Sequence, residues 1–405
     1  MENMKYVIIG NSTAGIGAVE GIRQLDRKGG IVIITNEPHH TYSRPLISYL
    51  LLGKITKDKI KYRDENFYKD NNAELIYGEA IGIDNKNKQV RLAGNRFISY
   101  DKLLVAAGSS AFAPPFEGLD GVGCKHNFMT LDDAENLNAA ADKNKRVLII
   151  GAGLIGLKCA EGIKNKVASV TILDMAPGIL SSILDTEGAK IVQSHLENKG
   201  FEFKLGCGVK YFDKNSAVLE NGERLDFDIL VLAVGVRPNV GLLNGTAEIM
   251  RGILVNENSE TSAPGIYAAG DCTQIKGQDK IMALLPNAYM QGECAGINMA
   301  GGKKSLDKLI PMNAIGFFGL HIITAGEYNG EIYREESAGS FKSLYYGDNK
   351  LNGYILIGDI EKAGIYTSLI REKRALDTLD FGLICRKPGL IAFGAEYRKI
   401  KLGGV

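Results

Sequence analysis

Two glycine-rich segments of the chain have the residue types and the position of phosphate-binding loops. The segment 10–17 follows the apolar stretch 5–9, and the segment 151–156 follows the apolar stretch 146–150. Such a turn lets free backbone N–H groups at the start of the next helix face a pyrophosphate. Glu37 and Asp174 follow about 20 residues after their loops, where a carboxylate accepts hydrogen bonds from a ribose. The chain is therefore predicted to bind two dinucleotides.

The two loops differ at their middle position. Ser12 stands where the usual pattern has a glycine, and its side chain narrows the approach of the backbone to a phosphate. The first loop is thus either a binding loop or only a packing turn, and the second follows the usual pattern. The residues expected at the phosphates are Gly10, Ser12, Ala14 and Gly15 in the first loop, and Gly151, Gly153, Leu154, Ile155 and Gly156 in the second. Because no arginine follows Asp174 in 175–177, NADH is favoured over NADPH.

The elements that must position these loops recur in one order. Each loop lies between an apolar strand and a helical stretch, and a second apolar strand follows, which makes a βαβ unit. Further apolar strands are expected at 102–108, 229–235 and 265–271, with a helix near 288–299. We therefore predict an α/β fold with two Rossmann-like dinucleotide-binding domains, the second inserted into the first. The predicted boundaries are 1–113 and 246–306 for the first domain, 114–245 for the second, and 307–405 for a small C-terminal α+β domain.

The C-terminal segment differs in character from the rest of the chain. Residues 345–357 have the pattern of a β-hairpin around 347–353, and 367–379 reads as a charged amphipathic helix. No motif there indicates a nucleotide site.

Composition narrows the functional classes. The chain has 405 residues, a formal net charge of +1, six dispersed cysteines and five histidines. A balanced charge gives no basic field for nucleic acid, and no apolar run approaches the roughly 18 residues that span a bilayer. We expect no metal centre, no nucleic-acid or membrane partner, and a cytoplasmic location, since no room is left for a signal peptide before the first strand.

Glycine is in excess, with 49 residues in the chain. Ten of them account for about half of an excess of roughly 20 over the usual share. We expect all ten in loops or strand ends at the dinucleotide sites or between the domains. They are Gly10, Gly15, Gly17, Gly108, Gly151, Gly153, Gly156, Gly235, Gly270 and Gly292.

The loops, taken with the segment 261–271, resemble the FAD-dependent pyridine nucleotide–disulfide oxidoreductase family. The resemblance implies FAD in the first site and NADH in the second. It places Asp271 on the ribityl chain of FAD, Ala80 beside the adenine and Ala288 at the pyrimidine edge of the flavin. It also makes 106–108, with Ala107 and Gly108, and 235–239, with Gly235, the connections between the two domains.

Within this family, residues 42–45 resemble the flavin-side motif of rubredoxin and ferredoxin reductases, which implies that Arg44 and Pro45 lie at the cofactor. Thiol-using members carry a reactive cysteine at or near the Pro45 position. This chain has no cysteine before Cys124, so the nucleophile for thiol–disulfide exchange and for cysteine-based peroxidase chemistry is absent. The C-terminal pattern 341–371 resembles NADH–rubredoxin reductases and the flavoprotein portion of the NADH–nitrite reductase large subunit.

Two positions depart from the family pattern. Lys158 stands where many members have a glutamate, and Tyr49 stands where ferredoxin reductases often have a lysine. The resemblance implies that these two residues, with Pro45, form the catalytic environment of the flavin. A cation near flavin N5 would raise the flavin potential by stabilising its anionic reduced form. Alternatively, the Lys158 side chain extends to solvent.

The resemblance implies an enzyme that takes hydride from NADH and passes single electrons to a small iron–sulfur carrier, rubredoxin or a ferredoxin-like protein. The basic stretch 54–63 either docks this acidic partner or is a solvated lysine-rich face. One alternative is an NADH oxidase that reduces oxygen to peroxide. Another is a flavoprotein subunit of a larger reductase complex, either oxidising NADH or binding nucleotide without catalysis. A homodimer is also compatible with the sequence.

Overall fold

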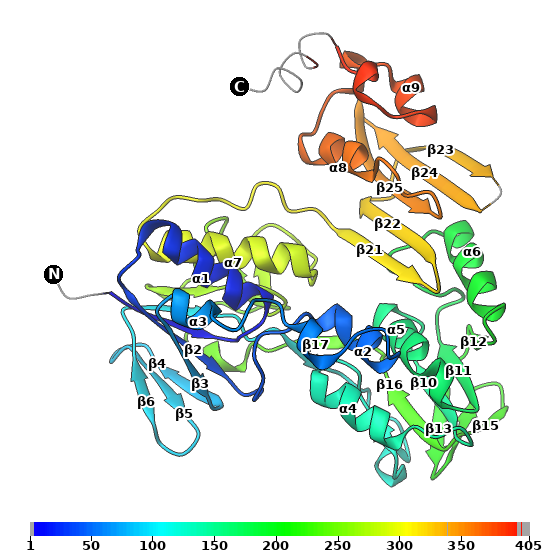
Figure 1. The fold of residues 1–405 in the computed structure, drawn as a ribbon, viewed down its shortest axis with the longest axis horizontal. Coiled ribbons are helices and arrows are strands. Elements are labelled where there is room, and N and C mark those ends of the chain that lie inside the picture. Colours follow the sequence, from blue (N-terminus) through cyan, green and yellow to red (C-terminus); the bar gives the residue numbers. More distant parts are fainter. Residues whose placement is uncertain (1–3, 338, 395–397, 399–405) are drawn as a thin grey trace.

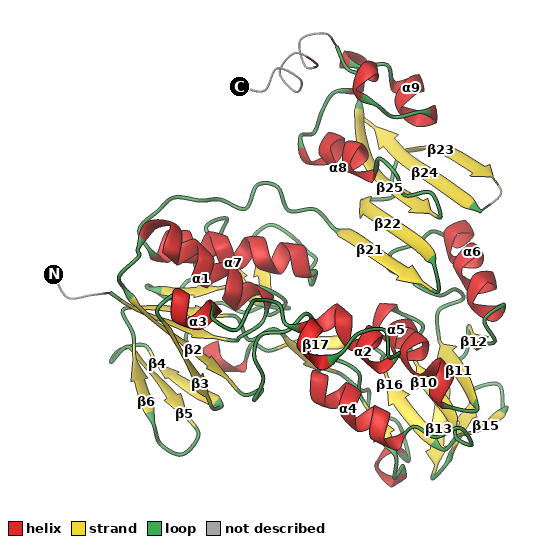
Figure 2. Cartoon of the chain, in the orientation of Figure 1, coloured by secondary structure: helices red, strands yellow, loops and turns green. Residues whose placement is uncertain are grey.

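The computed structural model describes residues 4–337, 339–394 and 398, whose main layers are three five-stranded sheets with their helices (Figure 1). Two of these sheets are parallel and the third is antiparallel, and short strands and helices connect them (Figure 2). The mixed α/β fold predicted from the sequence is confirmed. The predicted domain limits stay predictions, and their outermost residues 1–3 and 399–405 lie outside the described part of the chain.

The first parallel sheet has the strand order β19-β7-β1-β2-β3. Its helices are α1 (Thr13–Leu25) and α7 (Leu285–Met299), and α3 (Phe67–Asp70) precedes β3. The late strand β19 pairs with β7, so residues before and after the second sheet build one sheet. The strands are β1 (Lys5–Ile9), β2 (Gly30–Thr35), β3 (Ala73–Tyr77), β7 (Lys102–Val105) and β19 (Ile266–Ala268).

The second parallel sheet has the order β12-β11-β10-β16-β9. In both parallel sheets the central strands are continuous apolar runs, and β1 and β10 are buried on both faces after their first residue. The helices of the second sheet are α4 (Leu131–Ala140), α5 (Leu154–Ile163) and α6 (Thr186–Glu197). Its strands are β9 (Lys125–His126), β10 (Arg146–Ile150), β11 (Ser169–Asp174), β12 (Glu202–Leu205) and β16 (Ile229–Leu232).

Small sheets and a short helix join these layers. The helix α2 (Ile47–Leu51) packs against α4 and α5. The paired strands are β4 (Ala80–Asp84), β5 (Gln89–Leu92) and β6 (Phe97–Ser99); β8 (Ser109–Ala111) with β17 (Val236–Pro238); β13 (Val209–Asp213), β14 (Ser216–Leu219) and β15 (Arg224–Asp226); and β18 (Ile253–Val255) with β20 (Thr273–Ile275).

The C-terminal sheet has the order β21-β22-β25-β24-β23, and the predicted hairpin is its β24–β25 pair. The helix predicted over 367–379 is wrong in its limits: α8 spans Ala363–Arg371, and α9 spans Phe381–Arg386. Lys373 has a left-handed backbone (φ 46°), which ends α8 before the charged residues that suggested its continuation. The strands are β21 (Met312–Phe317), β22 (Leu320–Gly326), β23 (Glu331–Ser337), β24 (Ser340–Gly347) and β25 (Lys350–Ile357).

The helices α1 and α7 lie side by side and pack through glycine (Figure 1). A Cβ added to Gly292 would lie 1.9 Å from the backbone oxygen of Ala14, and one added to Gly17 would lie 2.5 Å from that of Tyr289. A Cβ on Gly296 would likewise lie 2.2 Å from the oxygen of Ala18. The expectation that all ten glycines lie in loops or strand ends is therefore wrong for Gly15, Gly17, Gly156 and Gly292, which lie within helices. Gly17 and Gly292 allow two helix backbones to approach closely.

None of the helices in the described ranges combines the length and the apolar character needed to cross a membrane.

Substitution Gly292→Ala should destabilise the protein, since the new methyl group overlaps the backbone of α1. We expect the free energy of unfolding to fall by about 1–3 kcal/mol, as in other overpacked cores. Urea unfolding followed by circular dichroism measures this. Gly364→Ala in α8 is the matched control, because its Cβ would enter open space and should stabilise by up to about 1 kcal/mol. Equal effects of the two variants would contradict the packing role of Gly292.

Candidate functional site

The two glycine-rich loops have the same backbone geometry. Gly10 and Gly151 have φ of +118° and +113°, which only glycine adopts without strain. A Cβ on Gly10 would lie 2.2 Å from the oxygen of Ala106, and one on Gly151 would lie 2.3 Å from that of Ala233. Each loop therefore turns directly against the end of the neighbouring strand, β7 or β16, before its helix begins.

The backbone conformation at the middle position of each loop explains why a serine is tolerated in the first loop. Ser12 precedes α1 with φ −105°, and Gly153 precedes α5 with φ −77°, so neither needs the conformational freedom of glycine. At the third position, a Cβ on Gly15 or Gly156 would lie 2.0 Å from the oxygen of the first glycine of its loop. The first and third glycines are thus required by the fold, and the middle one is not.

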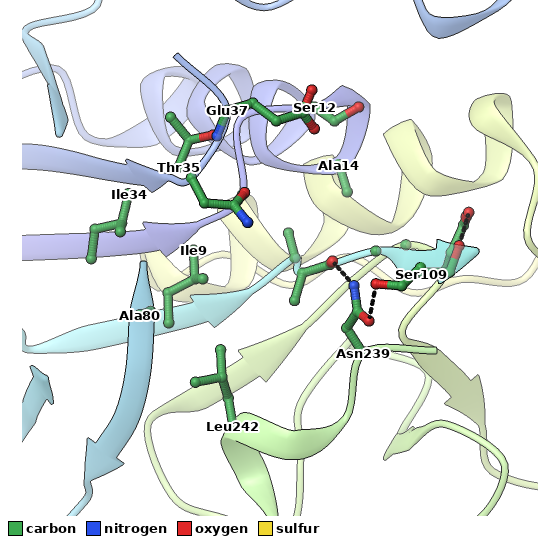
Figure 3. A pocket seen from close by; sticks show the side chains of 18 of the residues that line it. Ile9, Ser12, Ala14, Ile34, Thr35, Glu37, Ala80, Ser109, Asn239 and Leu242 are labelled. Carbon is green, nitrogen blue, oxygen red and sulfur yellow. Dashed lines mark hydrogen bonds between the residues drawn. The ribbon is translucent and has the colours of Figure 1, made fainter. Parts of the chain in front are cut away.

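A cavity of about 640 Å³ opens at the first loop, a volume within the range of small-molecule sites. It extends from the loop past the ends of β2 and β7 to the start of α7 (Figure 3). Of the residues expected at FAD, the cavity is lined by Gly10, Ser12, Ala14, Glu37, Arg44, Ala80, Ala107, Gly108, Asp271 and Ala288. The cavity therefore fits the predicted cofactor in size and in its two helix N-termini. Gly15 and Pro45 lie outside its lining: Gly15 packs behind Gly10, and the Pro45 carbonyl accepts a hydrogen bond from Ser48 (3.1 Å).

Glu37, the expected ribose acceptor, is held by two neighbours in this structure. Arg44 forms an ion pair with one carboxylate oxygen and Tyr42 donates a hydrogen bond to the other. Arg44 also donates to the carbonyl of Met129 (2.9 Å), and the Tyr42 hydroxyl accepts from the backbone N–H of Leu131 (3.0 Å). These bonds tie the ribose end of the cavity to the start of α4.

Asp271 follows β19 and lines the same cavity. Burial raises its pKa, while the Ser109 hydroxyl, at 3.4 Å, and the charge of Arg44 oppose that rise. A buried carboxylate with few partners is suited to accept hydrogen bonds from the hydroxyls of a bound polyol chain. The role of Asp271 on the ribityl chain of FAD, which the family resemblance implies, stays a prediction.

Several lining residues were not predicted from the sequence. Asn239 donates to the carbonyl of Ala107 (2.8 Å) and accepts from the Ser110 hydroxyl (2.7 Å), which fixes it at the cavity edge (Figure 3). Its neighbours Gly241 and Leu242 also line the cavity. The signal available was the segment 235–239, whose pairing through β17 with β8 brings Asn239 back to the first site.

The second loop lies on the other parallel sheet, away from this cavity. Asp174 accepts hydrogen bonds from the backbone N–H groups of Ala152 (2.7 Å) and Ala176 (2.8 Å). The carboxylate is thereby fixed beside the loop, at the end of β11. Gly235 leads into β17, and its carbonyl accepts from the N–H of Phe112 (3.1 Å). Leu154 and Ile155 open α5.

Lys158 and Tyr49 do come together, but with an additional partner. The Lys158 ammonium lies 4.6 Å from the centre of the Tyr49 ring, forms an ion pair with Glu161 and donates to the carbonyl of Gly316 (3.0 Å). Glu161 is 2% exposed and accepts from the N–H of Phe318 (3.0 Å). The alternative of a solvent-facing Lys158 is wrong, and the paired Glu161 weakens the argument that an isolated cation raises the flavin potential.

The basic stretch 54–63 carries fewer free charges than its sequence suggests. Lys57 pairs with Glu135, Lys61 pairs with Glu65, and Arg63 pairs with Glu20. Neutralised surface pairs attract an acidic partner only weakly. The structure therefore favours the interpretation as a solvated face.

All six cysteines are free, and each lies outside the lining of the cavity. Burial raises the pKa of Cys272 to about 11 and also raises that of Cys159, so both thiols are protonated at neutral pH. Within the described ranges, no group of three or more potential ligands is placed to hold a metal ion.

Comparison with known proteins identifies relatives over the whole chain. The family model described as pyridine nucleotide-disulphide oxidoreductase matches residues 4–292. The NADH-dependent phenylglyoxylate dehydrogenase subunit epsilon of Aromatoleum evansii is 32% identical and covers 94% of each chain. The NADH-rubredoxin oxidoreductase of Clostridium acetobutylicum is 28% identical, covering 94% of this chain and 97% of its own. The fold matches that of the crystallised covalent putidaredoxin reductase-putidaredoxin complex with a TM-score of 0.87, at 22% identity and full coverage of both chains.

Substitution Lys158→Met should leave Glu161 as an unpaired buried charge. We expect this to lower the free energy of unfolding by about 3–5 kcal/mol. The double variant Lys158→Met/Glu161→Gln should recover most of that loss, because the glutamine oxygen still accepts from Phe318 without carrying a charge. Thermal and urea unfolding midpoints measure both variants. If the double variant is no more stable than the single one, the ion pair does not govern the stability of this contact.

Proposed function

Because the chain belongs to the pyridine nucleotide-disulphide oxidoreductase family, we propose that its two loops serve one electron path, from NADH through FAD to a one-electron iron–sulfur acceptor. The protein is an NADH-dependent flavin oxidoreductase, with FAD and NADH as its cofactors. The finer assignment concerns the acceptor, rubredoxin or a ferredoxin-like protein.

One observation carries this proposal: β8 pairs with β17 and joins the two dinucleotide sites. β8 follows the edge of the first cavity, and β17 follows Gly235 at the end of the second sheet. FAD, when bound, accepts two electrons together and can release them one at a time. The chain's own task is to align two rings, so no side-chain acid or base is required.

The residues assigned to this task fall into two groups. In the first cavity, the N-termini of α1 and α7 stabilise the negative charge of a pyrophosphate and of the flavin edge, and Asp271 accepts from the ribityl hydroxyls. In the second site, the N-terminus of α5 faces the NADH pyrophosphate and Asp174 accepts from its ribose. Tyr49, Lys158 and Pro45 remain assigned beside the flavin ring as a proposal from the family resemblance.

The relatives support the choice of acceptor class. The full-length similarity to an NADH-rubredoxin oxidoreductase extends through the C-terminal domain, beyond the part matched by the family model. The absence of a cysteine before Cys124 removes the thiol that disulfide-reducing members use.

A second candidate is favoured by a separate observation. The relative from Aromatoleum evansii is a subunit of an NADH-dependent dehydrogenase and aligns with nearly the whole of this chain. This chain would then exchange electrons with an iron–sulfur partner subunit of a larger complex. Purification from the native source distinguishes the two, because a subunit of a larger complex co-purifies with other polypeptides, whereas a separate reductase yields the 43.8 kDa chain alone.

The proposal predicts that NADH bleaches the flavin band near 450 nm rapidly under anaerobic conditions and that added rubredoxin or ferredoxin restores it. Stopped-flow absorbance measures both steps. Turnover in air that exceeds turnover with either iron–sulfur protein, with peroxide as product, would instead support an NADH oxidase. Failure of NADH to bleach the flavin would contradict the electron path itself.

Substitution Gly153→Ala tests the second loop. The new methyl group meets no protein atom within 4 Å, so the fold should be retained, but it narrows the approach of the loop to the NADH pyrophosphate. We expect the KM for NADH to rise roughly tenfold, the equivalent of one charge-assisted hydrogen bond. Gly123→Ala, also into open space, is the control and should leave KM unchanged. An unchanged KM for Gly153→Ala would argue that this loop does not hold NADH.

A further inference from the structure

A second cavity, of about 380 Å³, lies beside the dinucleotide cavity. The two cavities share Thr13 and Leu285 in their linings, so they are direct neighbours. The other lining residues are Ser43, Tyr62, Pro286, Tyr289, Met290 and Arg371. These residues all belong to the first domain. Arg371 is the exception, because it lies in the last turn of α8 in the C-terminal domain.

Arg371 is a cation without a partner in this cavity. Its Nε atom is buried and has no hydrogen-bond partner, and the side chain takes part in no ion pair among residues 4–337, 339–394 and 398. The nearby Glu372 is engaged elsewhere, by the hydroxyl of Ser368 (2.8 Å). A buried donor left unpaired costs free energy, and guanidinium groups at such sites usually bind a carboxylate or phosphate through paired hydrogen bonds.

The other charges near the cavity cancel. Glu20 accepts hydrogen bonds from both Arg63 (2.7 Å) and the Tyr289 hydroxyl (2.6 Å), and the Arg63 guanidinium lies 4.3 Å from the centre of the Tyr62 ring. This network fixes the two tyrosine rings that line the cavity. The net charge facing the cavity is then that of Arg371, which selects for an anionic group.

The rest of the lining indicates a protein as the source of that group. Two tyrosines, a methionine and an arginine around Leu285 and Pro286 are the residue types enriched in the centres of protein–protein interfaces. The basic stretch 54–63, the other surface considered for docking, is largely neutralised by its own ion pairs.

We propose that this cavity is the docking subsite of the iron–sulfur acceptor and that Arg371 binds a carboxylate side chain of that protein. The inference rests on the proposed function and adds to it a role for the C-terminal domain: α8 brings the binding cation to the cavity that adjoins the cofactor cavity.

The experiment compares Arg371→Gln with the wild type, using oxidised rubredoxin as the probe. We expect the KM for rubredoxin to rise about tenfold, the usual effect of losing one charged hydrogen-bonded contact. Flavin bleaching by NADH, measured by stopped flow without an acceptor, should stay within twofold of the wild type. Arg386→Gln, in the last turn of α9 in the same domain, is the matched control and should change neither quantity.

A second arm tests the carboxylate. Rubredoxin whose carboxylates are amidated with glycinamide should have a raised KM with the wild type, and Arg371→Gln should add little to that increase. An equal additional loss would show that Arg371 does not act through a carboxylate and would overturn the proposal.

The remaining outcomes separate the two levels of inference. If the wild type is bleached by NADH and reduces rubredoxin, but Arg371→Gln has an unchanged KM, only the docking subsite is wrong. If Arg371→Gln slows bleaching as much as rubredoxin reduction, the residue acts on the cofactor and the docking subsite is again wrong. If the wild type reduces neither rubredoxin nor a ferredoxin, the proposed function fails first and the inference fails with it.

Discussion

The arrangement of this molecule depends on one close contact, the approach of helices α1 and α7 through positions that have no Cβ. Gly17 and Gly292 each face the backbone of the opposite helix at a distance where a methyl group would overlap it. Because the two helices pack side by side, both of their N-termini open onto one cavity. Two helix N-termini stabilise negative charge, and an anionic dinucleotide is the ligand that such a cavity accommodates.

The C-terminal domain contacts both of the other parts of the chain. Its β21–β22 turn meets α5 through Lys158 and Glu161, and its β24 contacts the start of α6, where Tyr345 donates to Asp185 (2.7 Å). Arg334 on β23 pairs with the same carboxylate (2.6 Å). These contacts fasten the domain to the second sheet. At the end of α8, the domain places Arg371 in the lining of the second cavity, which adjoins the first. One domain therefore spans the helices of the NADH side and the edge of the FAD side.

Much of the fold could be predicted from local pattern. The apolar runs before each loop, the spacing of Gly10 and Gly15, and the hairpin at 345–357 depend on neighbours in the chain, and each is found in the structure. The limits of α8 could not be predicted, because the charged residues after Arg371 fit a helix equally well until the left-handed Lys373 ends it. Most of the residues expected at FAD line the cavity, whereas Asn239 was missed because it reaches the cavity only through the pairing of β17 with β8.

The sequence alone determined the chemistry available to the protein. It encodes two dinucleotide loops with their acidic partners, no thiol before Cys124, and a C-terminal segment without a nucleotide motif. These features depend on residue type and short spacing, which the chain carries without folding. Only the tertiary structure decided how charges are paired, since the partners come from distant segments. The fold brings Lys158 into contact with Gly316 and Tyr49, and it pairs much of the basic stretch 54–63 with carboxylates. It leaves Arg371 as a cation facing a cavity. Packing also decided that Gly17 and Gly292 serve a helix contact, because the atoms that exclude a Cβ there belong to the other helix.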